Sequence, residues 1–469
     1  MDMPDIADML SRNCRKVVSW FKDDVFRRLF VNAARLLSAN VIAAGLGLVA
    51  TILTARALGP RDYGVLALII AYELTMARLV TFNAWQAVIK FGSEALQKGD
   101  DRALRQLIKF AFSLDISSAV VGTILAVGLA GPIVSLLGWN QSVRPLVVLY
   151  SLLILFTFSG TPVGVLRLFD RFDLLSYTAV LSALVKLTGV VWCSVSSQGL
   201  LGFVLVYLFT GIFGRLYGVC ASLWVLHTRK TGGIMGEPLR GIRASFPGIW
   251  DYVWTTNLTM TVRLLSREAD SLFIAGLTTP AALGLFKVAK QFASVLPKLS
   301  DPLSQSIYPE LTRSRAQGNK RQFLSLIKRT TVFTSTAAFS GWLVFVLAGR
   351  WIIHLTVGPA YEGAYWVTVI YMLALVVFLC CFALTPSLLA MGLARKSFIA
   401  NVVATVFYFA LLIPLVRTWG VVGASLAYLG FFVLWSAIML RYLSVSTSSW
   451  DTEAGHRCVR PQGVVPRLT

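Results

Sequence analysis

Basic side chains occur inside the long apolar stretches of this sequence. They are Arg78, Lys186, Arg215, Arg263, Arg267, Lys287 and Lys290. An ionisable group at the centre of a lipid bilayer costs about 2.5 kcal/mol or more, so such residues normally face a protein interior or a water-filled cavity. Acidic residues in the same stretches include Glu73 and Asp270, and the balance leans positive. A cavity lined by guanidinium and ammonium groups favours an anion, and phosphate oxygens suit both cations.

The spacing of these residues places several of them on common helix faces. At about 100° per residue, one face of the predicted helix over 281–308 forms a polar stripe within about a third of the circumference, made of Lys287, Lys290, Gln291, Ser294, Lys298, Asp301 and Gln305. In the preceding apolar run Thr259, Arg263, Arg267 and Asp270 line up in the same way. Two neighbouring helices would therefore present cations to a central cleft, and Arg78, Lys186 and Arg215 would do so from the first half of the chain.

A purely structural role is the alternative for each charge. Asp270 with Arg267, or Glu73 with a lysine of another helix, would then be neutralising pairs that fix packing. Asp115, Asp251 and Lys298 lie near the ends of apolar runs, where their side chains would reach the membrane interface.

The composition requires a membrane. Of the 469 residues 56% are hydrophobic and 14% charged, and the mean hydropathy is +0.71, which is too apolar for a water-soluble chain of this length. The net charge of +21 resides between the apolar runs, which indicates membrane topology rather than a nucleic-acid partner. The six cysteines are scattered, so we expect free thiols and neither a disulfide framework nor a metal site.

Twelve apolar runs are long enough to cross a bilayer, which takes roughly 20 residues. They lie near 36–58, 63–89, 107–131, 145–166, 173–196, 200–226, 250–277, 281–308, 327–349, 364–391, 396–416 and 419–442. The first run begins near Leu36 and is long enough to cross the bilayer, so we expect no cleavable signal peptide. Lys and Arg concentrate before the first span and in alternate loops, which predicts that both termini are cytoplasmic.

Four pairs of segments repeat in order. "TARALGPRDYGVLALI" from Thr54 is echoed by "IAGLTTPAALGLFKVA" from Ile274, with Pro60 and Pro280, and then Gly64 and Gly284, 220 residues apart. The other pairs are "GDDRALRQLIK" with "GNKRQFLSLIK", "TPVGVLRLFDR" with "TPSLLAMGLAR", and "GLLGFVLVYL" with "GVVGASLAYL". The chain is therefore expected to be two copies of a six-span unit.

An even number of spans makes the two copies enter the membrane in the same direction, so we predict an all-α membrane protein with two parallel lobes and a site between them near the midplane. The repeated turn would be the outer hairpin between the first two helices of each lobe. The predicted parts are a basic amphipathic cytoplasmic segment (1–34), a first lobe (35–226), a cytoplasmic linker (227–247), a second lobe (248–444) and a cytoplasmic tail (445–469).

Several of these stretches resemble one transporter family. "LTARALGPRDYGVLAL", "READSLFIAGLTTPAALGLFKVAKQ" and "GVVGASLAYL" are similar to the polysaccharide flippases of the multidrug/oligosaccharidyl-lipid/polysaccharide exporter superfamily, over about residues 35–443. The resemblance implies a V-shaped pair of six-helix lobes that moves an undecaprenyl-pyrophosphate-linked oligosaccharide across the bacterial inner membrane for lipopolysaccharide, capsule or exopolysaccharide assembly. It also implies cationic lumen residues for the pyrophosphate and, often, an ion gradient for the return step.

On this reading the chain is a flippase that works by alternating access. Its cations would bind pyrophosphate, while Asn257, Thr259, Gln291 and Ser294 supply polar groups to the lumen, and Glu73 or Asp270 couples protonation to the cycle. Asp270 matches an acidic position common in the family. The implied partners are the lipid-linked substrate, membrane lipids, and a polysaccharide polymerase with its chain-length machinery.

Three other functions fit the sequence less well. A cation-coupled drug exporter of the same superfamily would want a negative cleft, and peptidoglycan-precursor flippases typically carry two more C-terminal spans. A membrane polymerase or ligase needs a substantial outer loop with catalytic groups, whereas the two longest outer loops hold one histidine, His354, and one carboxylate, Glu362. The sequence carries no Gly-rich phosphate loop, Ser/His/Asp set or metal-ligand spacing, so we expect neither an enzyme nor a cofactor.

Overall fold

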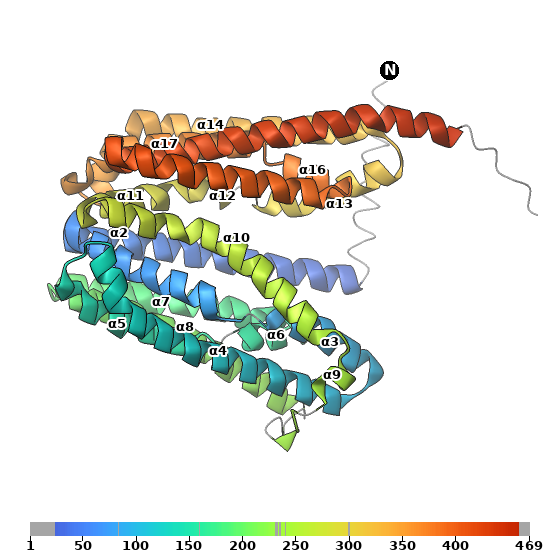
Figure 1. Ribbon diagram of the computed structural model, residues 1–469, viewed down its shortest axis with the longest axis horizontal. Helices are drawn as coiled ribbons and strands as arrows, with labels where there is room; N and C mark the ends of the chain where they lie inside the picture. The colour runs from blue at the N-terminus through green and yellow to red at the C-terminus, as the bar shows by residue number, and fades with distance from the viewer. Residues whose placement is uncertain are drawn as a thin grey trace, which may run out of the picture. The chain divides into compact units, whose positions relative to one another are not determined.

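The computed structural model describes residues 24–82, 84–158, 160–229, 233, 236–239, 241–298 and 301–458, without the side chains of 24–37, 259–270, 298, 301–306, 309, 316, 394 and 448–458. Every element in this part of the chain is helical (Figure 1). The chain divides into two compact units, one with the residues up to Ala57 and Ile69–Ala269, the other with Leu58–Leu68 and the residues from Asp270.

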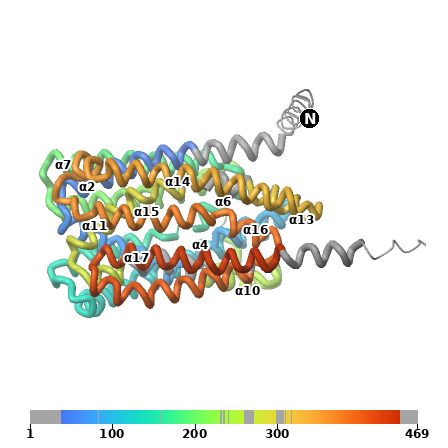
Figure 2. Tube along the Cα trace, turned by 90° about the horizontal axis from the view of Figure 1, so that it is seen from above, coloured from blue at the N-terminus to red at the C-terminus, as the bar shows by residue number. Residues whose placement is uncertain are grey.

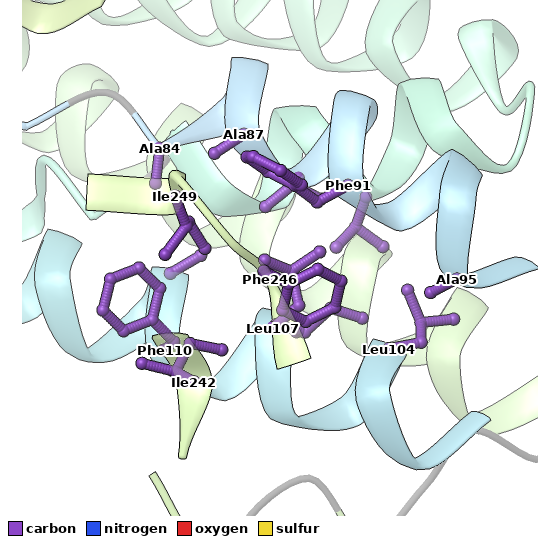
Figure 3. Packing of buried hydrophobic residues seen from close by; sticks show 14 of the residues in the cluster. Ala84, Ala87, Phe91, Ala95, Leu104, Leu107, Phe110, Ile242, Phe246 and Ile249 are labelled. Atoms are coloured by element: carbon purple, nitrogen blue, oxygen red, sulfur yellow. The ribbon is translucent and has the colours of Figure 1, made fainter. Parts of the chain in front are cut away.

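The first unit contains most of the first predicted repeat. Its elements are α2 (Asp24–Val80, which also supplies Leu58–Leu68 to the second unit), α3 (Trp85–Lys98), α4 (Asp101–Leu136), η1 (Gln141–Val143), α5 (Arg144–Ser151), η2 (Leu152–Phe156), α6 (Gly160–Leu168), α7 (Phe172–Val195), α8 (Leu200–Thr228), α9 (Ile242–Ser245) and the first part of α10 (Ile249–Leu277). A buried apolar cluster joins α3 and α4 to α9 and the start of α10, with Phe91, Leu107 and Phe246 among its members (Figure 3).

The second unit is built around one buried helix. It holds α11 (Pro280–Ala293), α12 (Val295–Lys298), α13 (Asp301–Ala316), α14 (Lys320–Thr356), η4 (Pro359–Tyr361), α15 (Ala364–Cys380), α16 (Leu384–Ala390) and α17 (Ala394–Cys458). α15 packs against α11, α14 and α17, and Figure 2 shows it running alongside α14 and α17. Tyr371 of α15 stacks on Tyr428 of α17 with ring centroids 4.4 Å apart, which extends the aromatic core across that contact.

The prediction of an all-helical protein with twelve spans is confirmed. Within the described residues eight helical stretches are long and apolar enough to cross a membrane. Two of them are double, because α2 is interrupted at Gly59 and α17 at Gly420, where the backbone leaves helical geometry. α10 and the run from α11 to α13 occupy the positions of the seventh and eighth predicted spans.

Four spans differ from the continuous helices that hydropathy suggested, among them the eighth, in which α11 ends at Ala293 and α13 begins at Asp301. The second ends at Val80 instead of near residue 89, and α3 begins afresh at Trp85. The fourth is interrupted between η2 and α6, and the tenth between α15 and α16. Hydropathy could not reveal the first break because Phe82, Trp85 and Val88 keep the stretch apolar across it.

The duplication is visible in matching helix caps. Gly99 and Gly318 both adopt left-handed backbone angles, with φ of 67° and 69°, a conformation that glycine reaches without strain. The residues that follow, Asp100 and Asn319, cap α4 and α14, each accepting a hydrogen bond from the backbone N–H three residues on. Both caps are of a kind that stabilises helix N-termini.

The fourth span of each repeat is interrupted at the same place. α6 begins at Gly160 and carries Thr161 and Pro162, and α16 begins at Leu384 and carries Thr385 and Pro386. Proline is favoured in the first turn of a helix, where its missing N–H is not needed. The repeated Thr-Pro therefore marks a helix restart in both halves.

The repeated hairpin turns contact each other within the second unit. A Cβ atom placed on Gly64 would lie 1.7 Å from the Pro280 carbonyl oxygen, and one on Gly284 would lie 2.3 Å from the Pro60 carbonyl oxygen. Neither position has room for a side chain. The common spacing of proline and glycine in the two turns is therefore required by a reciprocal backbone contact, in addition to the abrupt reversal that the sequence suggested.

The described part of the predicted linker is bound to the start of α4. Glu237 Oε1 lies 3.0 Å from Arg105 Nη2, Lys109 Nζ donates to the Glu237 carbonyl at 2.7 Å, and the Gln106 amide donates to the Pro238 carbonyl at 3.0 Å. These contacts hold the chain against α4 just before it enters α9. The amphipathic face predicted before residue 34 lies on side chains outside the described residues.

Replacing Gly64 by alanine should destabilise the second unit by at least about 1–3 kcal/mol, the usual cost of overpacking. The opposing atom is a backbone carbonyl, which cannot swing aside as a flexible side chain would. Thermal unfolding of the purified protein in detergent measures the effect. Gly45→Ala is the control, since a Cβ there meets nothing within 4 Å, and it should be neutral or stabilising by up to about 1 kcal/mol. Equal melting of Gly64→Ala and wild type would contradict the contact.

Candidate functional site

A buried ion pair joins two helices of the first unit. Glu73 lies on the second part of α2, and its Oε1 is 3.2 Å from Nη2 of Arg215 on α8. The Glu73 side chain is 3% exposed and that of Arg215 21%. The other terminal nitrogen of Arg215 donates to the Leu153 carbonyl in η2. Arg215 therefore satisfies both a carboxylate and a backbone carbonyl of the interrupted fourth span, and the partner of Glu73 is an arginine rather than the lysine considered from sequence.

A second cation lies against an aromatic ring. Lys186 Nζ of α7 is 4.0 Å from the ring centroid of Tyr207, within the range of a cation–π contact. The Tyr207 hydroxyl donates to the Thr54 hydroxyl at 3.2 Å. This contact links α7 and α8 to α2 and leaves the ammonium group without a carboxylate at ion-pair distance in the described part of the chain.

These groups form one polar cluster with a net positive charge. Arg78 and Arg215 both interact electrostatically with Glu73, and the buried Tyr150 of α5 interacts with Glu73, Arg215 and Tyr207. We call Arg78, Lys186, Arg215, Glu73, Tyr150 and Tyr207 the first-unit cluster. The cluster contains three cations and one carboxylate, so its formal charge is about +2, which favours an anion. Arginine forks, a lysine and tyrosine hydroxyls are groups that bind phosphate oxygens and sugars.

The second unit carries its predicted cations on α11. Lys287 and Lys290 are both half-buried, one helical turn apart, and Gln291 follows directly. The Ser294 hydroxyl donates to the Gln291 carbonyl at 2.7 Å. α11 ends at Ala293 and α13 begins at Asp301, so the predicted polar stripe is broken near Pro297 instead of running straight along one helix.

The remaining predicted site residues lie on α10. Asn257 is buried, and its amide donates to the Val253 carbonyl one turn earlier at 2.8 Å. The side chains of Thr259, Arg263, Arg267 and Asp270 lie outside the described residues, so their shared face stays a prediction.

The interface position proposed for Asp115 is wrong. This carboxylate is 1% exposed and accepts hydrogen bonds from the Thr161 amide and hydroxyl at 2.7 and 2.8 Å. The sequence signal was the Thr-Pro that begins α6, because a helix that restarts inside an apolar span needs a partner for its free amides. Nothing in the spacing along the chain connects residue 115 with residue 161.

Comparison with known proteins identifies the class. A family model described as "Polysaccharide biosynthesis protein" matches residues 52–365. The inner membrane protein YghQ of Escherichia coli (strain K12) is 28% identical over 346 residues, which are 74% of this chain and 97% of that protein.

Two solved structures share the fold. An inward-facing multidrug resistance transporter of the MATE family matches with a TM-score of 0.71 and 13% identity over 90% of this chain and 99% of that chain. The lipid II flippase MurJ in an inward closed conformation matches with a TM-score of 0.66 and 16% identity over 89% of this chain and 90% of that chain. At these identities the two likenesses show the fold that this chain shares with them.

Removing Arg215 should destabilise the protein more than removing both members of its pair. Arg215→Met leaves Glu73 as a buried carboxylate without its closest cation, at a cost of about 3 kcal/mol. In the double variant with Glu73→Gln part of this loss should be recovered, giving a coupling energy above about 1 kcal/mol in a thermal-unfolding cycle.

The exposed pair Glu310–Arg313, at 2.9 Å with side chains 46% and 59% exposed, is the matched control. Glu310→Gln and Arg313→Met should show almost no coupling, because solvent screens surface ion pairs. Additive effects of Glu73→Gln and Arg215→Met would refute the buried pair.

Proposed function

The chain belongs to the polysaccharide biosynthesis protein family, and from this premise we propose that it flips an undecaprenyl-pyrophosphate-linked oligosaccharide across a bacterial inner membrane. The product would enter lipopolysaccharide, capsule or exopolysaccharide assembly. The observation that carries the proposal is the net positive charge of the first-unit cluster, in which Arg78 and Arg215 interact with the carboxylate of Glu73 and Lys186 lies over the ring of Tyr207.

The chemistry of this substrate matches the residues. A pyrophosphate linkage is an anion with several oxygen acceptors, and arginine and lysine in a site shielded from water bind such groups strongly. The oligosaccharide offers hydroxyls to tyrosine, serine and amide side chains. Lys287 and Lys290, with Gln291 and Ser294, would supply the corresponding groups from the second unit, and Arg263 and Arg267 with Thr259 and Asn257 would supply them from α10.

The proposed mechanism is alternating access. The headgroup would enter from the cytoplasmic leaflet, exchange its hydration for the fixed cations, and leave when the lobes open outward. An acidic residue, Glu73 or Asp270, would take up a proton during the return step. Glu73 suits this role because it forms an ion pair with Arg215. A pyrophosphate that binds the Arg215 guanidinium would break this pair, and the buried carboxylate would then be neutralised by a proton.

A cation-coupled multidrug exporter is the second candidate, since the fold is shared with a MATE transporter. Exporters of lipophilic cations need a cavity that favours positive charge. The first-unit cluster is itself positively charged and therefore repels a cation, which favours the anionic glycolipid as the substrate.

The proposed site of action is the inner membrane with both termini cytoplasmic, and the proposed partners are a polysaccharide polymerase and its chain-length machinery. In a cysteine-free background, Arg61→Cys should react with an impermeant maleimide added to intact spheroplasts. Gln317→Cys should react only after lysis, because basic residues flank the loop that contains Gln317 and place it on the cytoplasmic side. Both residues are exposed. The reverse labelling pattern would invert the proposed orientation.

Loss of one lumen cation should slow transport at least about tenfold, the value of one charge-assisted contact to phosphate. In the native host, deletion of the gene should raise the amount of polyprenyl-pyrophosphate-linked oligosaccharide in lipid extracts, quantified by mass spectrometry. Wild-type protein should restore the normal amount, whereas Arg267→Ala and Lys186→Gln should not.

Arg56→Ala is the matched control, since this arginine is exposed in the described structure and should restore the normal amount. Immunoblots of membranes verify insertion of each variant. An unchanged glycolipid amount after deletion, together with greater retention of a cationic dye, would refute the flippase and support the drug exporter.

A further inference from the structure

The side chain of Asp115 on α4 accepts hydrogen bonds from the N-terminal ends of two helices. Its Oδ2 accepts from the amide and hydroxyl of Thr161, in the first turn of α6. Its Oδ1 accepts from the amide of Ala84, which precedes α3, at 3.4 Å. Thr161 and Ala84 are both buried, so the carboxylate is shielded from solvent and held by three donors at the N-terminal ends of two helices, where the helix dipoles also favour a negative charge.

The surroundings leave the carboxylate little freedom. A Cβ atom on Gly160 would lie 3.0 Å from Asp115 Oδ2, so a larger residue there would force the carboxylate or the start of α6 to shift by a few tenths of an ångström. One turn along α4, the Ser118 hydroxyl accepts from the Phe82 amide at 3.2 Å and donates to the Asp115 carbonyl at 2.9 Å. One turn of α4 therefore satisfies the backbone of both interrupted spans, which have little other access to hydrogen-bond partners inside a membrane.

The second repeat uses the same position differently. Thr334 of α14 stands 219 residues after Asp115, the offset of the matching α4 and α14 caps. The Thr334 hydroxyl lies 3.1 Å from the Leu379 carbonyl, at the end of α15 where the tenth span is interrupted, and 2.9 Å from the Thr330 carbonyl of its own helix, so its single hydrogen can be donated to either. Equivalent residues thus contact the interruption in both halves, but only the first half does so with an ionisable group.

We propose that Asp115 is a proton-binding site that links protonation to the conformation of the first unit. The three donors select the ionised form in this conformation. A movement that withdraws the N-termini of α3 and α6 would leave a buried carboxylate without partners, which is strongly unfavourable, so Asp115 takes up a proton from water as the contacts break and returns it when they re-form. This deepens the proposed function by supplying an ion-coupling residue other than Glu73 and Asp270.

The first charged residues in sequence on the neighbouring elements are Lys109 on α4, Lys90 on α3, Arg167 on α6 and Arg78 on α2. The backbones of Lys109, Lys90 and Arg167 each stand about 9 Å along their helix from the contact. The Arg167 guanidinium lies 4.7 Å from the ring centroid of Trp85, the residue after Ala84. Among the described residues the groups that hydrogen-bond to the Asp115 carboxylate are the Thr161 hydroxyl and two amides, so the proton is the natural ligand for neutralising it.

Hydrogen exchange of the backbone amides provides the test. The full-length protein in nanodiscs is exchanged between pH 8 and pH 5, and peptides covering 81–88 and 158–165 are followed by mass spectrometry, with rates corrected for the intrinsic pH dependence of exchange. Protection of both peptides should fall together by about tenfold at the acidic end in wild type. In Asp115→Asn it should be low at every pH.

Asp100→Asn is the matched control, because asparagine caps a helix as well as aspartate does, and its exchange should follow the wild type. The wild-type titration decides the matter even where Asp115→Asn does not accumulate in the membrane. Protection that stays constant with pH in wild type, or that stays at the wild-type value in Asp115→Asn, would overturn the proposal. Exchange as predicted with unchanged glycolipid after gene deletion would refute the proposed substrate and leave the proton site standing.

Discussion

The structure of this protein is limited by one requirement, that every backbone amide and carbonyl within a membrane must find a partner inside the protein. Continuous helices satisfy it by themselves, but the second, fourth, eighth and tenth spans are interrupted. Asp115 and Ser118 accept from three of the amides released in the first half, and the Thr334 hydroxyl can donate to a carbonyl released in the second. Interruptions of this kind are tolerated in a membrane where the released backbone groups are buried in protein.

The same requirement governs the charges. Arg215 is stable inside the first unit because one terminal nitrogen faces Glu73 and the other a carbonyl of the interrupted fourth span. Lys186 is stabilised by the face of Tyr207. Neither arrangement cancels the positive charge of the cluster, so the groups that stabilise its cations leave the cluster electropositive. The first unit can therefore remain folded while it still favours an anion.

The features that repeat or continue along the chain could be predicted from sequence. Apolar runs located the spans, and the paired segments located the duplication, because both depend only on residue type and separation. Contacts between residues far apart could not be found in this way. Glu73 and Arg215 are separated by 142 positions, and Asp115 and Thr161 by 46, and each partner alone fits several roles. The break after Val80 was missed because the residues on both sides of it are equally apolar.

The two repeats have kept their architecture and diverged in their ionisable groups. At the 220-residue offset of the hairpins, Glu73 corresponds to Ala293, and Lys287 corresponds to Ala67. At the 221-residue offset of the last matched segments, Arg215 corresponds to Ser436. Backbone requirements are common to both copies, so caps, turns and interruptions occur in both, whereas these three charged residues each occur in one copy alone. In the flippase that we propose, lobes with matching backbones and different charges would move in a related way while each binds a different part of one substrate. Asp115 and Thr334 occupy equivalent positions of the two repeats, and only Asp115 is ionisable. This difference suits a single protonation step, which needs an acid in only one lobe.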